Sequence, residues 1–414
     1  KTNDSLILDS SYIFFKKYQD EGDFSIIAFS KYGKLNVFGN IILKDTIKSN
    51  FNFVFLNGDT IIKFEDGLFE SYKNYNYLKA RNENIIFELV LDSQNVDLTF
   101  ISSNFNYEKL LKVFKIDSVR FDGYVALRIK GDLSNPKLFL NLDLNNAQFK
   151  KFLFNELYSS IYYYDKQINV DYFKISDKSG TFEGNLVLSS VLKLNPFSIT
   201  LEEGNIGGEV SFNGFPVDII EPFLFPNVVI DEGYIEGKAK ISGSLISPSL
   251  SGNAKIHSKN LAFTPFEIEF KSLDGSLTFY KNTIKVNDFI LNNSKSGILK
   301  INGFIVFSNK FKDINFDLTM EMAKFYFSLD DWTEFFISGF LKLSGKFPSL
   351  SIEGNLNIDQ GYVNYPVGYK SKSQPEAPNP LRYYITITAD RRIFFSNELV
   401  DAELSANLIL QKTS

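Results

Sequence analysis

His257 is the first residue to consider for chemistry, because it is the only histidine in the chain. A Ser/His/Asp triad or a His-rich metal site would have to use it. No nucleophile elbow and no zinc-ligand spacing surrounds it, and it occupies a polar position in the alternating stretch 250–257. We therefore interpret His257 as a surface residue on a strand.

Two pairs of adjacent acids and one glycine-rich segment are the remaining candidates for a reactive site. Glu202 and Glu203 would point to opposite faces of a strand, and Asp330–Asp331 fits the first turn of a helix. Residues 204–208 (GNIGG) lack the spacings of phosphate loops, so we expect a β turn there. The absence of cysteine excludes disulfides and thiolate metal sites. We predict no catalytic residues, no metal site and no cofactor, and hence no enzyme.

The elements of the chain are set by a hairpin that occurs three times, at residues 123–136, 233–248 and 338–348. Each copy reads as a strand, a turn begun by a glycine, a proline and a second strand. The turn glycines Gly131, Gly243 and Gly345 stand 112 (243 − 131) and 102 (345 − 243) residues apart. A repeat of this size favours an elongated, mostly β array over a compact domain.

Apolar residues alternate with polar ones along both strands of each hairpin, which places the apolar side chains on one face of the sheet. The positions that we predict to line a groove on this face are Val125, Leu127, Ile129, Leu138, Leu140, Leu142, Leu144, Ile241, Leu250, Ile256, Leu341, Leu343, Leu350, Ile352, Leu356 and Ile358. Such a face could be covered by a second sheet, a bilayer or a lipid. If the sheet curls into a trough, it can shield acyl chains, each CH₂ of which costs about 0.8 kcal/mol in water.

Upstream of each hairpin the apolar period changes toward 3.6, which predicts one short amphipathic helix per repeat. The apolar faces of these helices are Tyr107, Leu110, Leu111 and Phe114; Val217, Ile220 and Leu224; and Leu329, Trp332 and Phe336. Asn106 and Ser328 are the expected N-caps of the first and third helices, and Pro222 interrupts the second.

Composition limits the classes of partner. The 44% of hydrophobic residues, with 43 Phe and 21 Tyr, argue against disorder. The net charge of −5 lacks the basic footprint of a nucleic-acid-binding protein, so we expect no nucleic acid. No stretch reaches the roughly 20 apolar residues of a membrane-spanning helix, and the first residues are no signal peptide. We expect the chain to be a fragment of a longer protein, cut inside a β domain at its C-terminus.

The combination of short helix, Gly-x-hydrophobic-x-Gly hairpin, Leu-x-x-Pro segment and alternating strand resembles the repeating modules of the TamB family and its AsmA-like relatives, most clearly over 107–363. Residues 383–410 resemble the entry into the C-terminal domain of that family. The resemblance implies an antiparallel sheet curled into a groove, a β-taco or β-solenoid-like fold.

The same resemblance implies a place in the periplasm of a diderm bacterium, with an inner-membrane anchor that would precede this fragment. It implies a conduit that shields phospholipid acyl chains between the inner and outer membranes. The alternative is a scaffold for assembly or secretion of outer-membrane proteins, acting with a BamA-family barrel.

We divide the chain by these patterns into six segments. They are a groove segment at 1–106, repeat units with a short helix at 107–217 and 218–327, the start of a third unit at 328–369, a polar proline-rich loop at 370–380, and the start of a C-terminal domain at 381–414.

Overall fold

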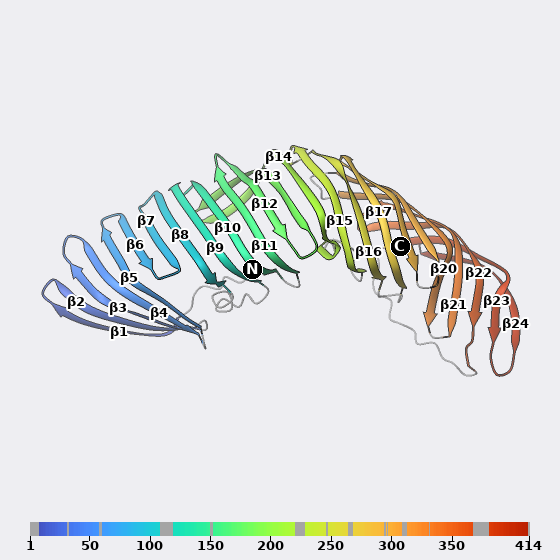
Figure 1. Cartoon of the computed structure of the whole chain (residues 1–414), viewed down its shortest axis with the longest axis horizontal. Coiled ribbons are helices and arrows are strands. Elements are labelled where there is room, and N and C mark those ends of the chain that lie inside the picture. The colour runs from blue at the N-terminus through green and yellow to red at the C-terminus, as the bar shows by residue number, and fades with distance from the viewer. Residues whose placement is uncertain are drawn as a thin grey trace. The chain divides into compact units, whose positions relative to one another are not determined.

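Figure 1 shows the chain as a computed structural model. The structure describes residues 8–30, 33–57, 60–107, 119–149, 152–219, 228–245, 247–263, 268–293, 295, 297–308, 313–330, 332–366 and 381–412. The chain divides into two compact units, each of which is a β sheet. The first consists of Lys1–Lys178 and Glu183–Asn205, and the second of Ser179–Phe182 and Ile206–Ser414.

The first unit is a meander in which each strand from β1 to β12 pairs antiparallel with the next. Its strands are β1 (Leu8–Tyr18), β2 (Glu21–Ser30), β3 (Gly33–Leu43), β4 (Ile47–Asn57), β5 (Thr60–Tyr72), β6 (Tyr75–Arg81), β7 (Ile85–Leu91), β8 (Asn95–Asn106), β9 (Val119–Asp132), β10 (Asn135–Phe149), β11 (Phe152–Tyr164), β12 (Gln167–Ser176) and most of β13 (Thr181–Leu194).

The second unit begins within β14 (Phe197–Pro216), which contributes residues to both units. Its further strands are β15 (Val228–Gly243), β16 (Pro248–Phe263), β17 (Ile268–Lys281), β18 (Thr283–Asn293), β19 (Ile298–Ser308), β20 (Asp313–Asp330), β21 (Thr333–Lys346), β22 (Ser349–Val363), β23 (Arg382–Ser396) and β24 (Asp401–Lys412). Consecutive strands pair antiparallel from β14 to β22, and β23 pairs antiparallel with β24. The pair β22–β23 is parallel, with Ser351 opposite Arg382.

The three predicted hairpins are confirmed as β9–β10, β15–β16 and β21–β22. Their recurring glycines have a conformational cause: φ is +108° at Gly131, +100° at Gly243 and +117° at Gly345. Side chains are strained at such angles, and glycine is not. The predicted fold class, a mostly β, repetitive antiparallel sheet, is confirmed.

A β-bulge with a left-handed residue interrupts several strands near their middle. At three of these bulges the backbone N–H donates to a side chain of the next strand: Asp288 (φ 47°) to Asn302 Oδ1 at 2.7 Å, Lys324 (φ 46°) to Ser338 Oγ at 3.0 Å and Arg391 (φ 48°) to Ser405 Oγ at 3.0 Å. The strand registers shift at the same places. Because bulges bend and twist the strand that carries them, they supply curvature to the sheet.

Two contacts measure how strongly the sheets curl. In the first unit, Leu194 N–H at the end of β13 donates to Leu133 O, beside β10, at 2.8 Å. In the second unit, the rings of Phe270 in β17 and Phe325 in β20 lie 5.8 Å apart. Strands three positions apart in a flat sheet would be separated by about 14 Å. Each sheet is therefore folded inward, and Phe270 and Phe325 are buried on the inside.

The prediction of a helix at 328–336 is wrong. These residues form the end of β20 and the beginning of β21, where Phe327 pairs with Phe335 and Asp330 with Thr333. Three apolar residues at helical spacing are too few to outweigh the strand preference of the surrounding aromatic residues. Trp332 is thus an exposed turn residue and not part of an apolar helix face.

The two other predicted helices lie mostly outside the described residues. Tyr107 alone is helical in the first, and residues 108–118 are not described. In the second, Val217–Ile219 forms one 3₁₀ turn before the undescribed residues 220–227. The predicted loop at 370–380 also lies outside the described part.

Candidate functional site

The apolar face of the first unit is continuous across seven strands. Paired residues in register build one ladder from β6 to β12: Leu78, Leu89, Leu98, Ile129, Leu138, Tyr163 and Ile168. A second ladder runs beside it: Ala80, Phe87, Phe100, Leu127, Leu140, Ile161 and Val170. Because residues paired across a sheet lie on the same face, these side chains form one apolar surface.

The second unit repeats this arrangement from β17 to β24. One ladder consists of Leu273, Leu291, Leu299, Met322, Gly339, Leu356, Ile387 and Leu408. The apolar face continues across the parallel pair, since Ile352 in β22 pairs with Tyr383 in β23. The change of strand direction therefore does not interrupt the surface.

The residues that we predicted to line a groove all lie on this apolar face, and none of them is exposed. In the first unit the register brings Leu138 against Ile129 and Leu140 against Leu127. Leu144, Ile256, Leu341, Leu350 and Ile358 are buried, and the other members of the set are half-buried. Their role as a lipid lining stays a prediction.

The inner side of the second unit is largely filled by its own side chains. Its buried cluster consists of Val217, Ile230, Ile235, Ala254, Ile256, Phe270, Leu273, Leu291, Leu299 and Phe325. The cluster includes Phe270 and Phe325, whose rings meet across the curled sheet, and Ile256 is the predicted lining residue that belongs to it.

The first unit, in contrast, has an open space on its apolar face. A cavity of about 380 Å³ is lined by Ile13, Phe15, Phe24, Ile26, Val37, Ile41, Ser49, Phe51, Phe69 and Leu78. Volumes of this size are typical of small-molecule sites. The cavity joins the ladders, because Leu78 belongs to both. Sequence reasoning missed these residues, although the alternation around Val37 and Ile41 follows the same pattern.

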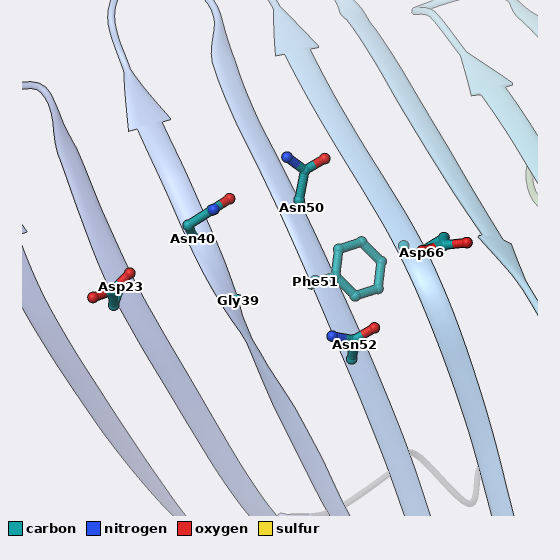
Figure 2. Close-up of a pocket in the computed structure, with 8 residues that line it drawn as sticks. Asp23, Gly39, Asn40, Asn50, Phe51, Asn52 and Asp66 are labelled. Carbon is teal, nitrogen blue, oxygen red and sulfur yellow. The ribbon is translucent and has the colours of Figure 1, made fainter.

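The opposite face of β2 to β5 carries a polar patch. Figure 2 shows a cavity there, of about 380 Å³, whose polar lining is Asp23, Asn40, Asn50, Asn52 and Asp66. Asn40 pairs with Asp23 and with Asn50 across the sheet, so these side chains share a face. Asp66 forms an ion pair with Arg81, with 2.8 Å between Asp66 Oδ2 and the guanidinium nitrogen. The lining of this cavity is therefore more polar than that of the cavity on the apolar face.

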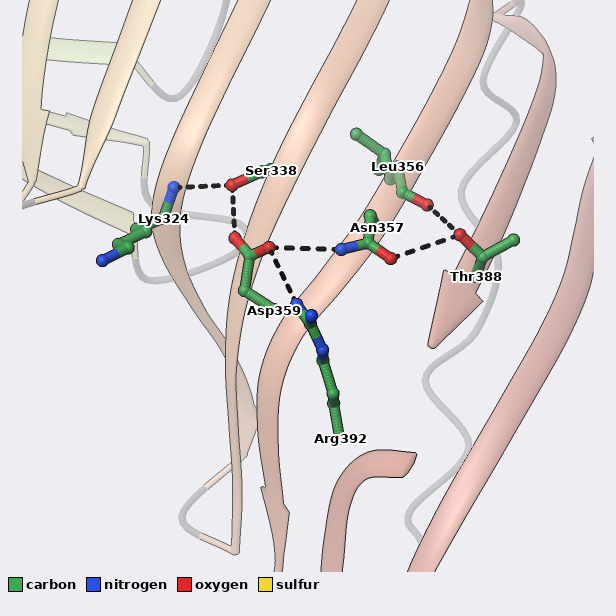
Figure 3. Close-up of polar contacts among 7 residues, drawn as sticks. All are labelled: Lys324, Ser338, Leu356, Asn357, Asp359, Thr388 and Arg392. Carbon is green, nitrogen blue, oxygen red and sulfur yellow. Dashed lines mark hydrogen bonds and ion pairs between the residues drawn. The ribbon is translucent and has the colours of Figure 1, made fainter. Parts of the chain in front are cut away.

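A polar network on the second unit connects β20 to β23 (Figure 3). Lys324 N–H donates to Ser338 Oγ at 3.0 Å, and the Ser338 hydroxyl donates to Asp359. Asp359 also accepts from Asn357 Nδ2 at 3.2 Å and lies 3.8 Å from the Arg392 guanidinium. This network fixes one bulge and helps to hold the parallel strand β23 against β22.

Carboxylates at one edge of the first unit are bound to the turns that carry them. Hydrogen bonds from the hydroxyl and the backbone N–H of Ser134 hold the pKa of Asp132 below its ordinary value. The backbone N–H groups of Gln94 and Asn95 lower the pKa of Asp92 in the same way. Both acids stabilise hairpin turns and are not poised for proton transfer.

The candidates for chemistry do not assemble into a site within the described residues. His257 Nδ1 lies 2.5 Å from Asp274 Oδ1 on the neighbouring strand, in a surface pair. The expected β turn at 204–208 is wrong. These residues lie inside strand β14, where the backbone stays extended through the glycines and the chain does not reverse direction. The side chains of Glu202 and Glu203 and residue 331 lie outside the described part.

Searches for a metal site and for a membrane-spanning helix were also made over the described part of the chain. No group of three or more His, Asp or Glu side chains there could hold a metal ion. No described helix has the length and hydropathy needed to cross a membrane.

Comparison with known families connects the second unit to one of them. Residues 283–414 match the family model described as the TamB C-terminal domain. The match covers β18 to β24, so it includes the third hairpin, the parallel pair and the ladder from Leu291 onward. Comparison with curated proteins and with solved structures gave no match. TamB proteins act in the assembly and transport systems of the bacterial cell envelope. The match of residues 283–414 to the TamB C-terminal domain confirms the resemblance to the TamB family predicted from the sequence.

Proposed function

We propose that the chain is a conduit in the periplasm that shields phospholipid acyl chains on their way between the inner and outer membranes. The observation that supports this most directly is the continuous apolar face within each unit. Its ladders run from strand to strand at right angles to the strands, and the cavity beside Leu78 shows space on that face. Lipid moving along such a face would meet the same kind of surface at each strand.

The energetics favour this use of the surface. Exposure of one long acyl chain to water costs on the order of 10 kcal/mol, so a lipid leaves a membrane only onto a surface that keeps its chain covered. Apart from Tyr163, whose hydroxyl is hydrogen-bonded to Asn135 and to Leu192 N–H, the ladders of the first unit consist of Leu, Ile, Val, Phe and Ala, which offer no polar partner. We therefore expect the affinity to be similar at successive strands, which allows a lipid to slide.

We also propose that the chain performs no catalysis and needs no cofactor. The apolar face would act by covering the acyl chains of lipids, and this function requires no reactive side chain. A driving force for directional transport would have to come from other components of the envelope.

Charges placed on the apolar face provide the test. The variants Leu140→Asp, Ile256→Asp and Ile352→Asp put a carboxylate on the face, and Phe139→Asp, Lys255→Asp and Asn355→Asp put one on the opposite, exposed side of the same strands. Transfer of a fluorescent phosphatidylethanolamine between vesicles by the purified chain is measured. We expect inner-face variants that retain their β circular dichroism to lose transfer, and outer-face variants to keep it.

Two results would reject the conduit. One is normal transfer by folded inner-face variants. The other is a purified chain that neither transfers lipid nor releases any on extraction.

A role as a scaffold beside a BamA-family outer-membrane barrel is the second candidate. The observation that favours it is the surface of β24, where Leu404, Leu408 and Leu410 are exposed. A strand of a partner could add to this sheet. The scaffold predicts that Ile409→Asp, which places a carboxylate on the exposed face of β24 opposite the ladder, abolishes co-purification of the barrel and leaves lipid transfer intact.

A further inference from the structure

Ser49 is a polar residue in an otherwise apolar cavity. It lies near the beginning of β4, between Ile41 of β3 and Phe69 of β5, with which it pairs. The nine other residues that line the cavity are Ile, Phe, Val or Leu. Ser49 is only 6% exposed.

The Ser49 hydroxyl is buried without a hydrogen-bond partner. Two other buried serines are satisfied within the chain, since Ser102 Oγ contacts the Tyr107 hydroxyl and Ser258 Oγ donates to Asn260 O at 2.8 Å, whereas the buried Ser190 hydroxyl in β13 is unpaired like that of Ser49. A buried hydroxyl without a partner costs about 1–3 kcal/mol, so its presence calls for an explanation. Rotation between staggered χ1 rotamers can turn this hydroxyl toward the cavity that Ser49 lines.

A single enclosed water would be a poor partner for the unpaired hydroxyl. A buried water needs two to four polar partners, and Ser49 is the only polar side chain among the described residues lining the cavity. An acceptor that arrives together with apolar material suits this lining better. An acyl chain with a carbonyl group at one end has this composition.

The position of Ser49 in the cavity matches the order of groups in such a ligand. Ser49 and Ile41 lie two residues from the β3–β4 turn, whereas Val37 lies about 13 Å farther along β3. A carbonyl beside Ser49 would leave the polar end of the ligand at the turn and the hydrocarbon along Ile41 and Val37.

We propose that this cavity is a subsite for one acyl chain of an ester lipid, with the ester carbonyl accepting a hydrogen bond from the Ser49 hydroxyl. This inference rests on the proposed function, since it requires that lipid reaches the apolar face. The Ser49 hydroxyl would hold the lipid at one defined position on a surface that is otherwise uniformly apolar. It would distinguish ester-linked from ether-linked lipids, irrespective of their headgroup.

The test compares two phosphatidylethanolamines that differ only in linkage, one with palmitoyl esters and one with hexadecyl ethers, supplied in vesicles of phosphatidylcholine. Bound lipid is extracted from the purified chain and quantified by mass spectrometry. A third arm supplies palmitic acid, which carries the carbonyl without an ester. The variants are Ser49→Ala, Ser49→Thr, which keeps a hydroxyl, and Ser190→Ala as the matched control, because Ser190 is also buried and unpaired but lies in β13.

The native chain and Ser190→Ala should retain the ester lipid two- to tenfold better than the ether lipid, as expected for one hydrogen bond. Ser49→Ala should bind both lipids equally, and Ser49→Thr should restore the preference. If lipid binds without an ester preference, or if Ser49→Ala keeps that preference, the subsite is refuted and the conduit stands. Stronger retention of palmitic acid than of the ester overturns the ester assignment in favour of a free fatty acid. If the native chain binds no lipid, both proposals fail.

Discussion

Replacement of Gly303 by alanine tests whether the bends of the sheet depend on glycine. Gly303 in β19 has φ +140°, and an added Cβ would lie 2.1 Å from Asp317 O on β20. Ordinary contact begins at 3.4 Å, so the two strands would have to separate by 1.3 Å (3.4 − 2.1). The neighbouring Asn302 side chain, which accepts the N–H of the bulge residue Asp288, would be displaced as well.

The cost can be assembled from two contributions. Holding alanine at this φ costs about 2 kcal/mol. Separating the strands weakens two ladder hydrogen bonds, at about 1 kcal/mol each. We therefore expect Gly303→Ala to lower the local stability of β19 and β20 by about 4 kcal/mol.

Hydrogen exchange measured by mass spectrometry is the appropriate assay, because an array of strands can open locally without global unfolding. A loss of about 4 kcal/mol should accelerate exchange of the protected β19–β20 amides about a thousandfold. Gly207→Ala is the control, since an added Cβ there meets nothing within 4 Å and its φ is unstrained. Gly131→Ala separates the two contributions, because its φ is +108° and no atom lies within 4 Å. Equal exchange in Gly303→Ala and Gly207→Ala would refute the reasoning.

Two further predictions concern single side chains. Asn293 is buried, accepts the N–H groups of Lys295 and Gly297, and donates to Tyr326 O, so Asn293→Ala should cost about 2–4 kcal/mol and lower the midpoint of thermal unfolding; an unchanged midpoint would contradict this role. Burial, followed by the hydrogen bond to Glu88, raises the pKa of Tyr77 from 10.0 to about 12. Because the folded pKa lies above the unfolded one, this contribution to stability is complete below pH 10 and is lost as the pH rises toward 12. Glu88→Gln should move the phenolate absorbance titration back toward the ordinary value, and an unmoved titration would exclude Glu88 as a cause.

The strands and hairpins could be predicted from the sequence because they depend on local signals. Period-two alternation at 138–144 places Leu138 and Leu140 on one face whatever the partner strand is. The glycines of the three hairpins mark positive φ, which is a property of the single residue. These signals were sufficient to place the apolar residues of the hairpins on one face of the sheet, while their role as a lipid lining stays a prediction.

The bends could not be predicted in this way. Lys324 adopts a left-handed conformation, although nothing in its own type favours it, because Ser338 on another strand accepts its N–H. The parallel pair also has no local signal, since the alternation in β23 fits either direction. The helix expected at 328–336 failed for the opposite reason: a local period was read where cross-strand pairing of Phe327 and Phe335 decides the structure.

The cavity residues lie where the sequence offered alternation without a repeated hairpin. Ile13 and Phe69 are more than fifty residues apart and reach the same cavity only through the registers of five strands. Ser49 could not have been singled out, because its importance comes from a missing partner and not from its type.

The parallel pairing of β22 and β23 has a consequence for the order of folding. Each antiparallel hairpin of the second unit can close like a zipper from its own turn, because its strands are neighbours in the chain. Strand β23 cannot do so, since Arg382 lies opposite Ser351 and the chain must first close a loop of eighteen residues (382 − 363 − 1) after Val363. The hairpin β23–β24 can form from its own turn in the meantime. It would then dock onto β22 as a preformed unit, so that the last part of the sheet is assembled by the collision of two finished pieces.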